Sequence, residues 1–167
     1  MKNKITVGST LKPSLTDTSQ SAIKGPFANL QFSCTIVNMN IIADTNAYLA
    51  VALNQPEKDR IITLSANCEL FSPEILPYEL GNALSAMVKR KQLDADEALA
   101  ALQVARAIPV KLVSADIQKS LELASSFNIY AYDAYFLQSA LSLGYPLLTL
   151  DKGMQYVARQ LSITILE

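Results

Sequence analysis

Short apolar segments alternate with helix-forming segments from Met39 to the end of the chain, and this alternation restricts the fold more than any other feature. The clearest apolar segment is 146–150, which is continuously apolar apart from one threonine. Such a run is typical of a strand in a parallel sheet that is covered on both faces. Residues 40–43 form a second strand of this kind, for which a start as early as 34–37 is also compatible. The pattern predicts an α/β fold, a three-layer α/β/α sandwich with a mostly parallel central sheet.

Hydrophobic periodicity and capping residues predict the other elements. Strands are expected at 68–71, 110–113 and 163–166, and helices at 46–53, 57–66, 74–91, 95–107, 115–127, 132–143 and 154–160. Pro73 is expected to begin the helix 74–91, Ser114 to cap the helix 115–127, and Gly144 to end the helix 132–143. Asp94, followed three residues later by Glu97, predicts a capping box.

Residues 1–38 differ from the rest of the chain. They are rich in Ser and Thr, lack periodicity, and carry a net charge of +3, whereas residues 39–167 carry −4. They do not resemble a signal peptide, because no apolar segment follows their polar first residues. Two explanations stay open, a flexible extension or an upstream start with translation beginning at Met39. We expect one domain, residues 39–167.

The chain has no histidine, and this excludes most hydrolytic sites. A Ser-His-Asp triad, a Cys-His pair, His-rich zinc sites and imidazole acid–base catalysis are all unavailable. An enzyme of this composition must rely on carboxylates, Lys, Tyr or a bound metal. No apolar run approaches the roughly 20 residues of a membrane helix, and two cysteines make no disulfide framework, so we expect a soluble cytoplasmic protein.

Four acidic residues are candidates for a site. Asp44 and Asp151 each follow directly after a predicted apolar strand, where α/β folds bind ligands. A helix cap explains these two positions as well as a functional role does. Glu79 and Asp133 lie among apolar or aromatic neighbours on predicted helices, where a charge is costly unless it is paired or bound to metal. An ordinary solvated helix face is the weaker explanation for these two.

Four converging carboxylates would require cations. Two carboxylates about 4 Å apart repel by roughly 4 kcal/mol at an effective dielectric constant near 20. Oxygen-only ligands select hard metals, so Mg²⁺ is expected, with Mn²⁺ as a substitute. A metal in such a site activates water and neutralises a phosphate, which would let an acidic protein cleave an anionic polymer without histidine.

Residues 39–167 resemble the PIN domain family, in particular the toxin ribonucleases of the virulence-associated-protein-C (VapC) type. Four segments carry the resemblance, and they occur in the family's order: 39–46, 78–84, 131–134 and 148–151. The resemblance implies a PIN-like, Rossmann-like fold and assigns the metal-binding acids to Asp44, Glu79, Asp133 and Asp151. It implies supporting polar roles for Asn46, Thr149 and Asn82, of which Asn82 is explained equally well as a helix-face amide.

Some positions depart from the family pattern or lie outside it. Phe136 stands where the family often has Tyr, and Met154 where an aromatic residue is common, but both keep the apolar bulk. We expect Tyr132 to pack rather than react.

The resemblance implies a Mg²⁺-dependent endoribonuclease that leaves 5′-phosphate and 3′-hydroxyl ends. It also implies a homodimer and an antitoxin partner that blocks the site. Contacts to the RNA backbone are expected from Lys89, Arg90, Lys91 and Lys152, although the first three also suit a helix C-terminus.

Two other classes of function stay open at this stage. A strand-end Asp with Mg²⁺ also serves phosphoaspartate phosphatases and receiver domains, but such phosphatases usually carry Asp where Asn46 stands. A non-catalytic RNA-binding or interaction module on a PIN scaffold is the second alternative. The intact acids argue against it, because clustered negative charge does not help a protein to bind RNA.

Overall fold

The computed structural model describes residues 39–167. An earlier start of the first strand at 34–37 and the expectations for residues 1–38 lie outside the described residues. Within the described part, no helix is long and apolar enough to cross a membrane.

A four-stranded parallel sheet forms the centre of the described domain. Its strands are β1 (Met39–Ala43), β2 (Cys68–Pro73), β3 (Lys111–Val113) and β4 (Leu147–Leu148), arranged in the order β3-β2-β1-β4. Every pairing is parallel, with Ile42 opposite Phe71 on one side and opposite Leu147 on the other. The predicted parallel sheet is therefore confirmed.

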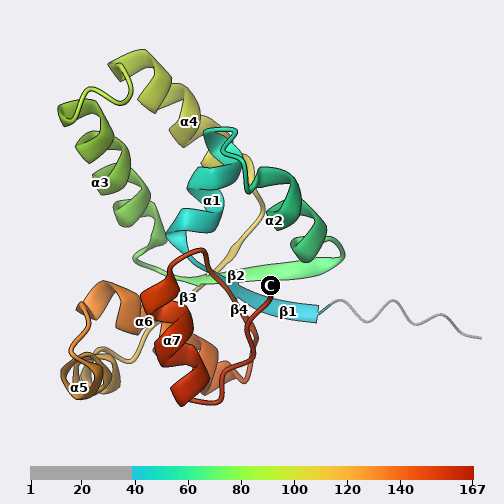
Figure 1. Ribbon diagram of the computed structural model, residues 1–167, viewed down its shortest axis with the longest axis vertical. Coiled ribbons are helices and arrows are strands. Elements are labelled where there is room, and N and C mark those ends of the chain that lie inside the picture. The colour runs from blue at the N-terminus through green and yellow to red at the C-terminus, as the bar shows by residue number, and fades with distance from the viewer. Residues whose placement is uncertain (1–38) are drawn as a thin grey trace, which may run out of the picture. The chain divides into compact units, whose positions relative to one another are not determined.

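The helices cover both faces of the sheet (Figure 1). They are α1 (Thr45–Ala52), α2 (Lys58–Ser65), α3 (Leu76–Lys89), α4 (Ala95–Ala107), α5 (Ile117–Phe127), α6 (Ala131–Leu143) and α7 (Lys152–Gln160). Side chains alternate between the faces along β1. Ile41 packs into a core formed with α1 to α4, whereas Ile42 packs into a second core with residues of α6 and α7. The predicted three-layer arrangement follows from this alternation.

The predicted capping box at the start of α4 is confirmed. Asp94 Oδ1 accepts a hydrogen bond from the Glu97 backbone N–H, and Glu97 Oε2 accepts one from the Asp94 backbone N–H, both at 2.8 Å. Gly144 ends α6 in the left-handed conformation, with φ of 67°, as the sequence predicts.

Two predicted helix starts are wrong. Pro73 is the last residue of β2, and the proline in the first turn of α3 is Pro77. A proline is tolerated there because the first-turn N–H groups have no partner within the helix. The cap of α5 is Asp116 rather than Ser114, since the Asp116 carboxylate accepts a hydrogen bond from the Lys119 backbone N–H.

The two C-terminal strands are shorter than predicted. β4 ends at Leu148 because β1, its partner, gives way to Asp44 and the start of α1. The predicted strand 163–166 is reduced to a single parallel bridge between Leu147 and Ile165. A two-residue β4 offers too little backbone for a longer pairing.

We predict that Leu137→Ala lowers the free energy of unfolding by about 2–5 kcal/mol, because its fully buried side chain fills the second core. Leu141→Ala, on the same helix but 49% exposed, should cost less than about 1 kcal/mol. Urea unfolding of both variants measures the difference. Equal destabilisation would contradict the placement of Leu137 in the core.

Candidate active site

Asp44 and Asp151 follow two neighbouring strands, β1 and β4, at the position where the strand order reverses. From β1 the chain adds β2 on one side, while β4 pairs on the other side of β1. Asp44 follows β1 directly, and Asp151 lies three residues after β4. In open parallel sheets the loops that follow two such strands diverge and leave a crevice. Both acids therefore lie where such a fold binds ligands.

The Asp44 carboxylate is buried and hydrogen-bonded through both oxygens. It is 1% exposed. Its Oδ1 accepts a hydrogen bond from the Ala47 backbone N–H at 2.9 Å and so caps α1. Its Oδ2 accepts one from Thr149 Oγ1 at 2.5 Å. Capping, one of the two alternatives that the sequence left open for Asp44, is therefore confirmed, and a functional role stays a prediction.

A second layer of hydrogen bonds fixes the end of β1. The Ser72 hydroxyl, from β2, donates to the Ala43 carbonyl oxygen at 2.6 Å and lies 3.2 Å from the Tyr48 hydroxyl. All three residues are buried. Since Ala43 precedes Asp44, these contacts restrict where the Asp44 carboxylate can lie.

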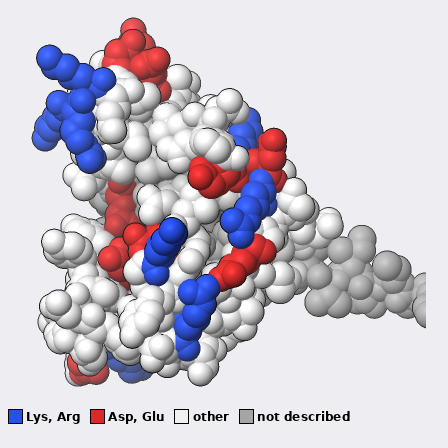
Figure 2. All heavy atoms as spheres, in the orientation of Figure 1, with Lys and Arg blue, Asp and Glu red and all other residues white. Residues whose placement is uncertain are grey.

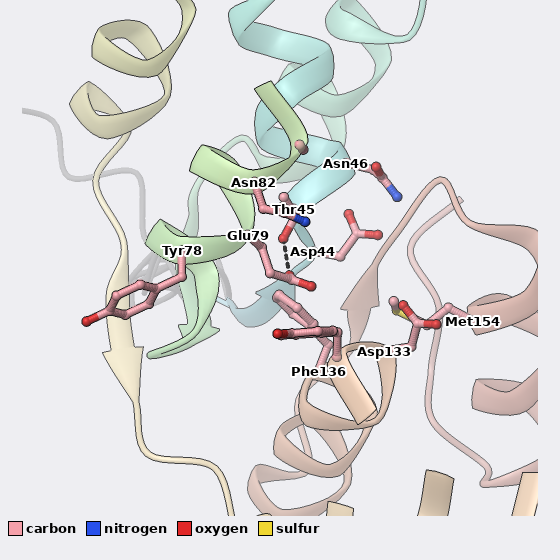
Figure 3. A pocket seen from close by; sticks show the side chains of 11 residues that line it. Asp44, Thr45, Asn46, Tyr78, Glu79, Asn82, Asp133, Phe136 and Met154 are labelled. Atoms are coloured by element: carbon pink, nitrogen blue, oxygen red, sulfur yellow. Dashed lines mark hydrogen bonds between the residues drawn. The ribbon is translucent and has the colours of Figure 1, made fainter. Parts of the chain in front are cut away.

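Glu79 reaches the site from the first turn of α3. Thr45 Oγ1, at the start of α1, donates to Glu79 Oε2 at 2.5 Å (Figure 3). The sequence does not single out Thr45, whose only signal is its position directly after Asp44. This hydrogen bond orients Glu79 and joins α1 to α3 beside the acids.

Asp133 and Asp151 complete the acidic group from the other side of the crevice. Asp133 lies in the first turn of α6 and is half-buried. Asp151 is exposed and caps α7, because its Oδ1 accepts a hydrogen bond from the Met154 backbone N–H at 2.7 Å. Thr149 Oγ1 also accepts a hydrogen bond from the Asp151 backbone N–H at 3.0 Å. One threonine therefore contacts two of the four predicted acidic residues.

Three of the four acids line a pocket of about 220 Å³. Figure 3 shows Asp44, Glu79 and Asp133 in the pocket, with Asn46 and Asn82 nearby. The full lining is Asp44, Thr45, Asn46, Tyr78, Glu79, Asn82, Ala83, Tyr132, Asp133, Phe136 and Met154. Asp151 is not part of the lining, but its charge acts on two acids that are. Residues 39–167 contribute no Lys or Arg to this lining.

Burial and neighbouring charges raise the pKa values of three of the acids. The pKa of Asp44 is raised to about 6: burial raises it most, the hydrogen bonds from Thr149 and Ala47 lower it, and the charges of Asp151 and Glu79 raise it. Burial also raises the pKa of Glu79, again with a contribution from a neighbouring charge, that of Asp133. The pKa of Asp133 is raised by burial and then by Asp151. The four residues therefore form one electrostatic unit.

This donor set fits a hard divalent cation. It offers carboxylate, hydroxyl and amide oxygens, and the protein has no histidine to favour zinc. Burial raises the pKa values of Asp44, Glu79 and Asp133, and the charges of neighbouring carboxylates raise them as well. Among residues 39–167, no three acidic side chains lie close enough as they stand to form a metal-ligand group. A bound ion would have to draw the carboxylates together.

The predicted basic contacts divide into two groups. Lys89, Arg90 and Lys91 lie at the far end of α3, where Figure 2 shows basic side chains. Ten residues of helix place Lys89 roughly 15 Å along the axis from Glu79. Arg90 Nε donates to the Ala86 carbonyl oxygen, so it serves the helix C-terminus. Lys152 alone adjoins the acids, directly after Asp151 and exposed.

Three residues that the sequence assigned to packing face the pocket. Phe136 and Met154 line it and are buried, as expected of apolar bulk. Tyr132 packs against Tyr135 but remains 53% exposed at the pocket. Tyr78, which the sequence did not distinguish, also lines the pocket and is 75% exposed. Exposure of these rings depends on how α3 and α6 are placed, which local sequence does not specify.

We predict that, without divalent cations, the protein becomes more stable as the pH falls from 7 to 5. A carboxyl group with a pKa raised from 3.8 to about 6 binds its proton more tightly in the folded chain than in the unfolded chain. Its stabilising proton is present below pH 4 and lost as the pH rises through about 6, a difference of about 3 kcal/mol. Asp44→Asn should remove this part of the pH dependence.

Unfolding in EDTA at pH 5 and pH 7 measures the effect, with Mg²⁺ then added at both. Mg²⁺ should stabilise the wild type more at pH 7, because protons compete for the carboxylate at pH 5. The prediction is wrong if wild type and Asp44→Asn show the same dependence on pH.

Comparison with known proteins gives an independent result. The sequence profile of the PIN domain matches residues 41–160. No curated protein sequence shows a significant match. Among solved structures, the PAE2754 protein of Pyrobaculum aerophilum has 24% sequence identity and a TM-score of 0.58, over 78% of this chain and 86% of that chain. A chain from VapBC2 of Rickettsia felis, bound to a DNA fragment from the promoter, has 16% identity and a TM-score of 0.53. That match covers 77% of this chain and 98% of the other.

At these identities the solved structures establish the fold, which is PIN-like as the sequence predicts. The profile match is what assigns the family, since it spans well over half of the chain and includes all four acids. The chain belongs to the PIN domain family.

Proposed function

We propose that this protein is a Mg²⁺-dependent endoribonuclease whose site is formed by Asp44, Glu79, Asp133 and Asp151. One observation carries the proposal: three acids with raised pKa values, Asp44, Glu79 and Asp133, line a pocket to which residues 39–167 contribute no Lys or Arg. The charge of Asp151 acts on two of them. Such an arrangement costs stability unless a cation binds. PIN domains are typically Mg²⁺-dependent nucleases, which supports the same conclusion.

The chain's own residues would have distinct tasks in this reaction. Asp44, Glu79, Asp133 and Asp151 would hold Mg²⁺, which when bound supplies charge neutralisation at the phosphate and activation of water. Thr149 holds Asp44 at its Oδ2, and Thr45 holds Glu79. The Ala47 N–H, at the start of α1, fixes the other Asp44 oxygen. Asn46 and Asn82 can donate hydrogen bonds to the scissile phosphate or to water in the pocket.

Two partners belong to this proposal. The similarity to a chain of VapBC2, a complex that was bound to promoter DNA, supports an antitoxin that covers the site. The protein would then be the toxin of a toxin–antitoxin pair. The homodimer that the family resemblance implies stays a prediction.

Membership of the PIN family argues against the phosphatase and receiver-domain alternatives. The non-catalytic module is a weaker candidate, because a protein that only binds RNA gains nothing from uncompensated carboxylates.

We predict that the purified protein cleaves RNA in Mg²⁺ but not in EDTA, and leaves 5′-phosphate ends. Asp44→Asn should lower the rate by about 100-fold or more, because a metal ligand that serves charge stabilisation is lost. Asp96→Asn, which removes an exposed acid from α4 outside the pocket, is the matched control and should cleave normally. Cleavage in EDTA, or full activity of Asp44→Asn, would refute the mechanism.

A second prediction concerns Thr149 as a positioning residue. Thr149→Val removes the hydroxyl that donates to Asp44 and accepts from the Asp151 N–H. The pKa of Asp44 should rise further, so the acidic limb of the pH–rate profile should move to higher pH when Mg²⁺ is below saturation. Thr149→Ser keeps the hydroxyl and should restore the profile. A lower rate with an unmoved profile in Thr149→Val would assign Thr149 a structural role alone.

A further inference from the structure

Two tyrosine rings flank the acidic pocket and are largely exposed. Tyr78 is 75% exposed and directly precedes Glu79 on α3. Tyr132 is 53% exposed and directly precedes Asp133 on α6. Both line the pocket. Each side of the crevice thus pairs one acid with one neighbouring ring.

The rings are placed to receive a ligand that extends beyond the acids. Figure 3 shows the Tyr78 ring at the rim, directed away from the carboxylates of Asp44 and Glu79. The Tyr132 ring meets that of Tyr135 nearly edge-on, with centroids 6.2 Å apart and an interplanar angle of 82°. This contact holds Tyr132 in place while half of its surface stays accessible.

The acidic charge of the pocket does not favour binding of RNA, whereas aromatic rings can bind bases without the help of charge. An acidic pocket to which residues 39–167 contribute no Lys or Arg does not itself attract a polyanion, and Lys89–Lys91 lie at the far end of α3. Stacking of a base on an aromatic ring does not depend on net charge and contributes about 1–3 kcal/mol per base. Bases inside a duplex are covered on both faces by their neighbours and cannot use such rings.

We propose that Tyr78 and Tyr132 stack on the bases on the two sides of the scissile phosphate and so position the RNA chain at the acids. The proposal rests on the ribonuclease function and adds the residues that position the substrate. In this arrangement the acids and their cation act on the phosphate, and the two rings bind the bases that flank it.

The test is binding of a fluorescein-labelled single-stranded RNA and of its duplex, in Mg²⁺, by Asp44→Asn protein, in which cleavage is suppressed. Into this background Tyr78→Ala and Tyr132→Ala are introduced, each beside the corresponding Phe variant. Tyr156→Ala is the matched control, because Tyr156 lies on α7, is 63% exposed and does not line the pocket. Thermal unfolding establishes that each variant is folded.

Each pocket Ala variant should weaken single-stranded binding roughly 5- to 150-fold, the equivalent of losing one stacked base. The Phe variants and Tyr156→Ala should bind as the parent does, and duplex binding should change little. Ala variants that bind single-stranded RNA as the parent does would overturn the proposal and assign the rings to a protein partner. Equal losses for Phe and Ala would also overturn it, because the hydroxyl rather than the ring would then matter.

Cleavage by the same Tyr variants, with Asp44 intact, separates this proposal from the ribonuclease function. Wild-type cleavage with an unchanged KM in both Ala variants would contradict the stacking role and leave the nuclease standing. RNA binding that depends on the two tyrosines, without cleavage of RNA by the wild type, would support the stacking role and contradict the ribonuclease function.

Discussion

The hydrogen bonds of the buried Asp44 carboxylate connect the elements on which the site depends. One oxygen caps α1 through the Ala47 N–H, and the other accepts from Thr149, which follows β4 on the opposite side of β1. Thr149 in turn receives the Asp151 N–H, so the ends of two neighbouring strands and the start of two helices meet around one charged group. Hydrogen bonds to a charged group are among the stronger ones in proteins. Because they occupy both oxygens, they set the direction from which any ligand can reach Asp44.

That arrangement opposes stability and thereby favours binding. The hydrogen bonds to Asp44 lower its pKa, yet burial outweighs them and the pKa is still raised to about 6. The pKa values of Glu79 and Asp133 are raised as well, first by burial and then by the charges of neighbouring acids. A protein without a use for these charges would gain by replacing one of them, since an isolated buried charge is expensive. In the proposed site a bound divalent cation would offset this cost, because each carboxylate would gain more from the ion than it loses to burial and to its neighbours.

The sequence predicts the parallel sheet, because strands depend on short patterns, and it singles out four acids, three of which line one pocket. Their role as site residues stays a prediction. A continuously apolar run indicates a buried strand, and an acid that ends it is visible without any tertiary information. Errors arise where the outcome depends on a distant partner. Pro73 belongs to β2 because its strand pairs with β3, and the segment 163–166 loses its strand because β4 is only two residues long. Thr45 also escapes notice, because its hydrogen bond joins residues 34 positions apart. For Asp44 the structure adds that a capping carboxylate can also line a pocket, which no local pattern indicates.

The positions of the Lys and Arg side chains bear on which residues could bind RNA near the acids. Lys89–Lys91 stand roughly 15 Å from Glu79 along α3, and Arg90 already binds a carbonyl of its own helix. In the proposed ribonuclease these residues could steer RNA toward the protein over about one Debye length, but they could not hold the scissile phosphate. Of the four basic residues that the sequence singles out, Lys152 is the one that adjoins the acids. Alignment of the RNA chain would therefore depend on groups whose attraction does not depend on charge. The two exposed tyrosines meet that requirement at the rim of the pocket.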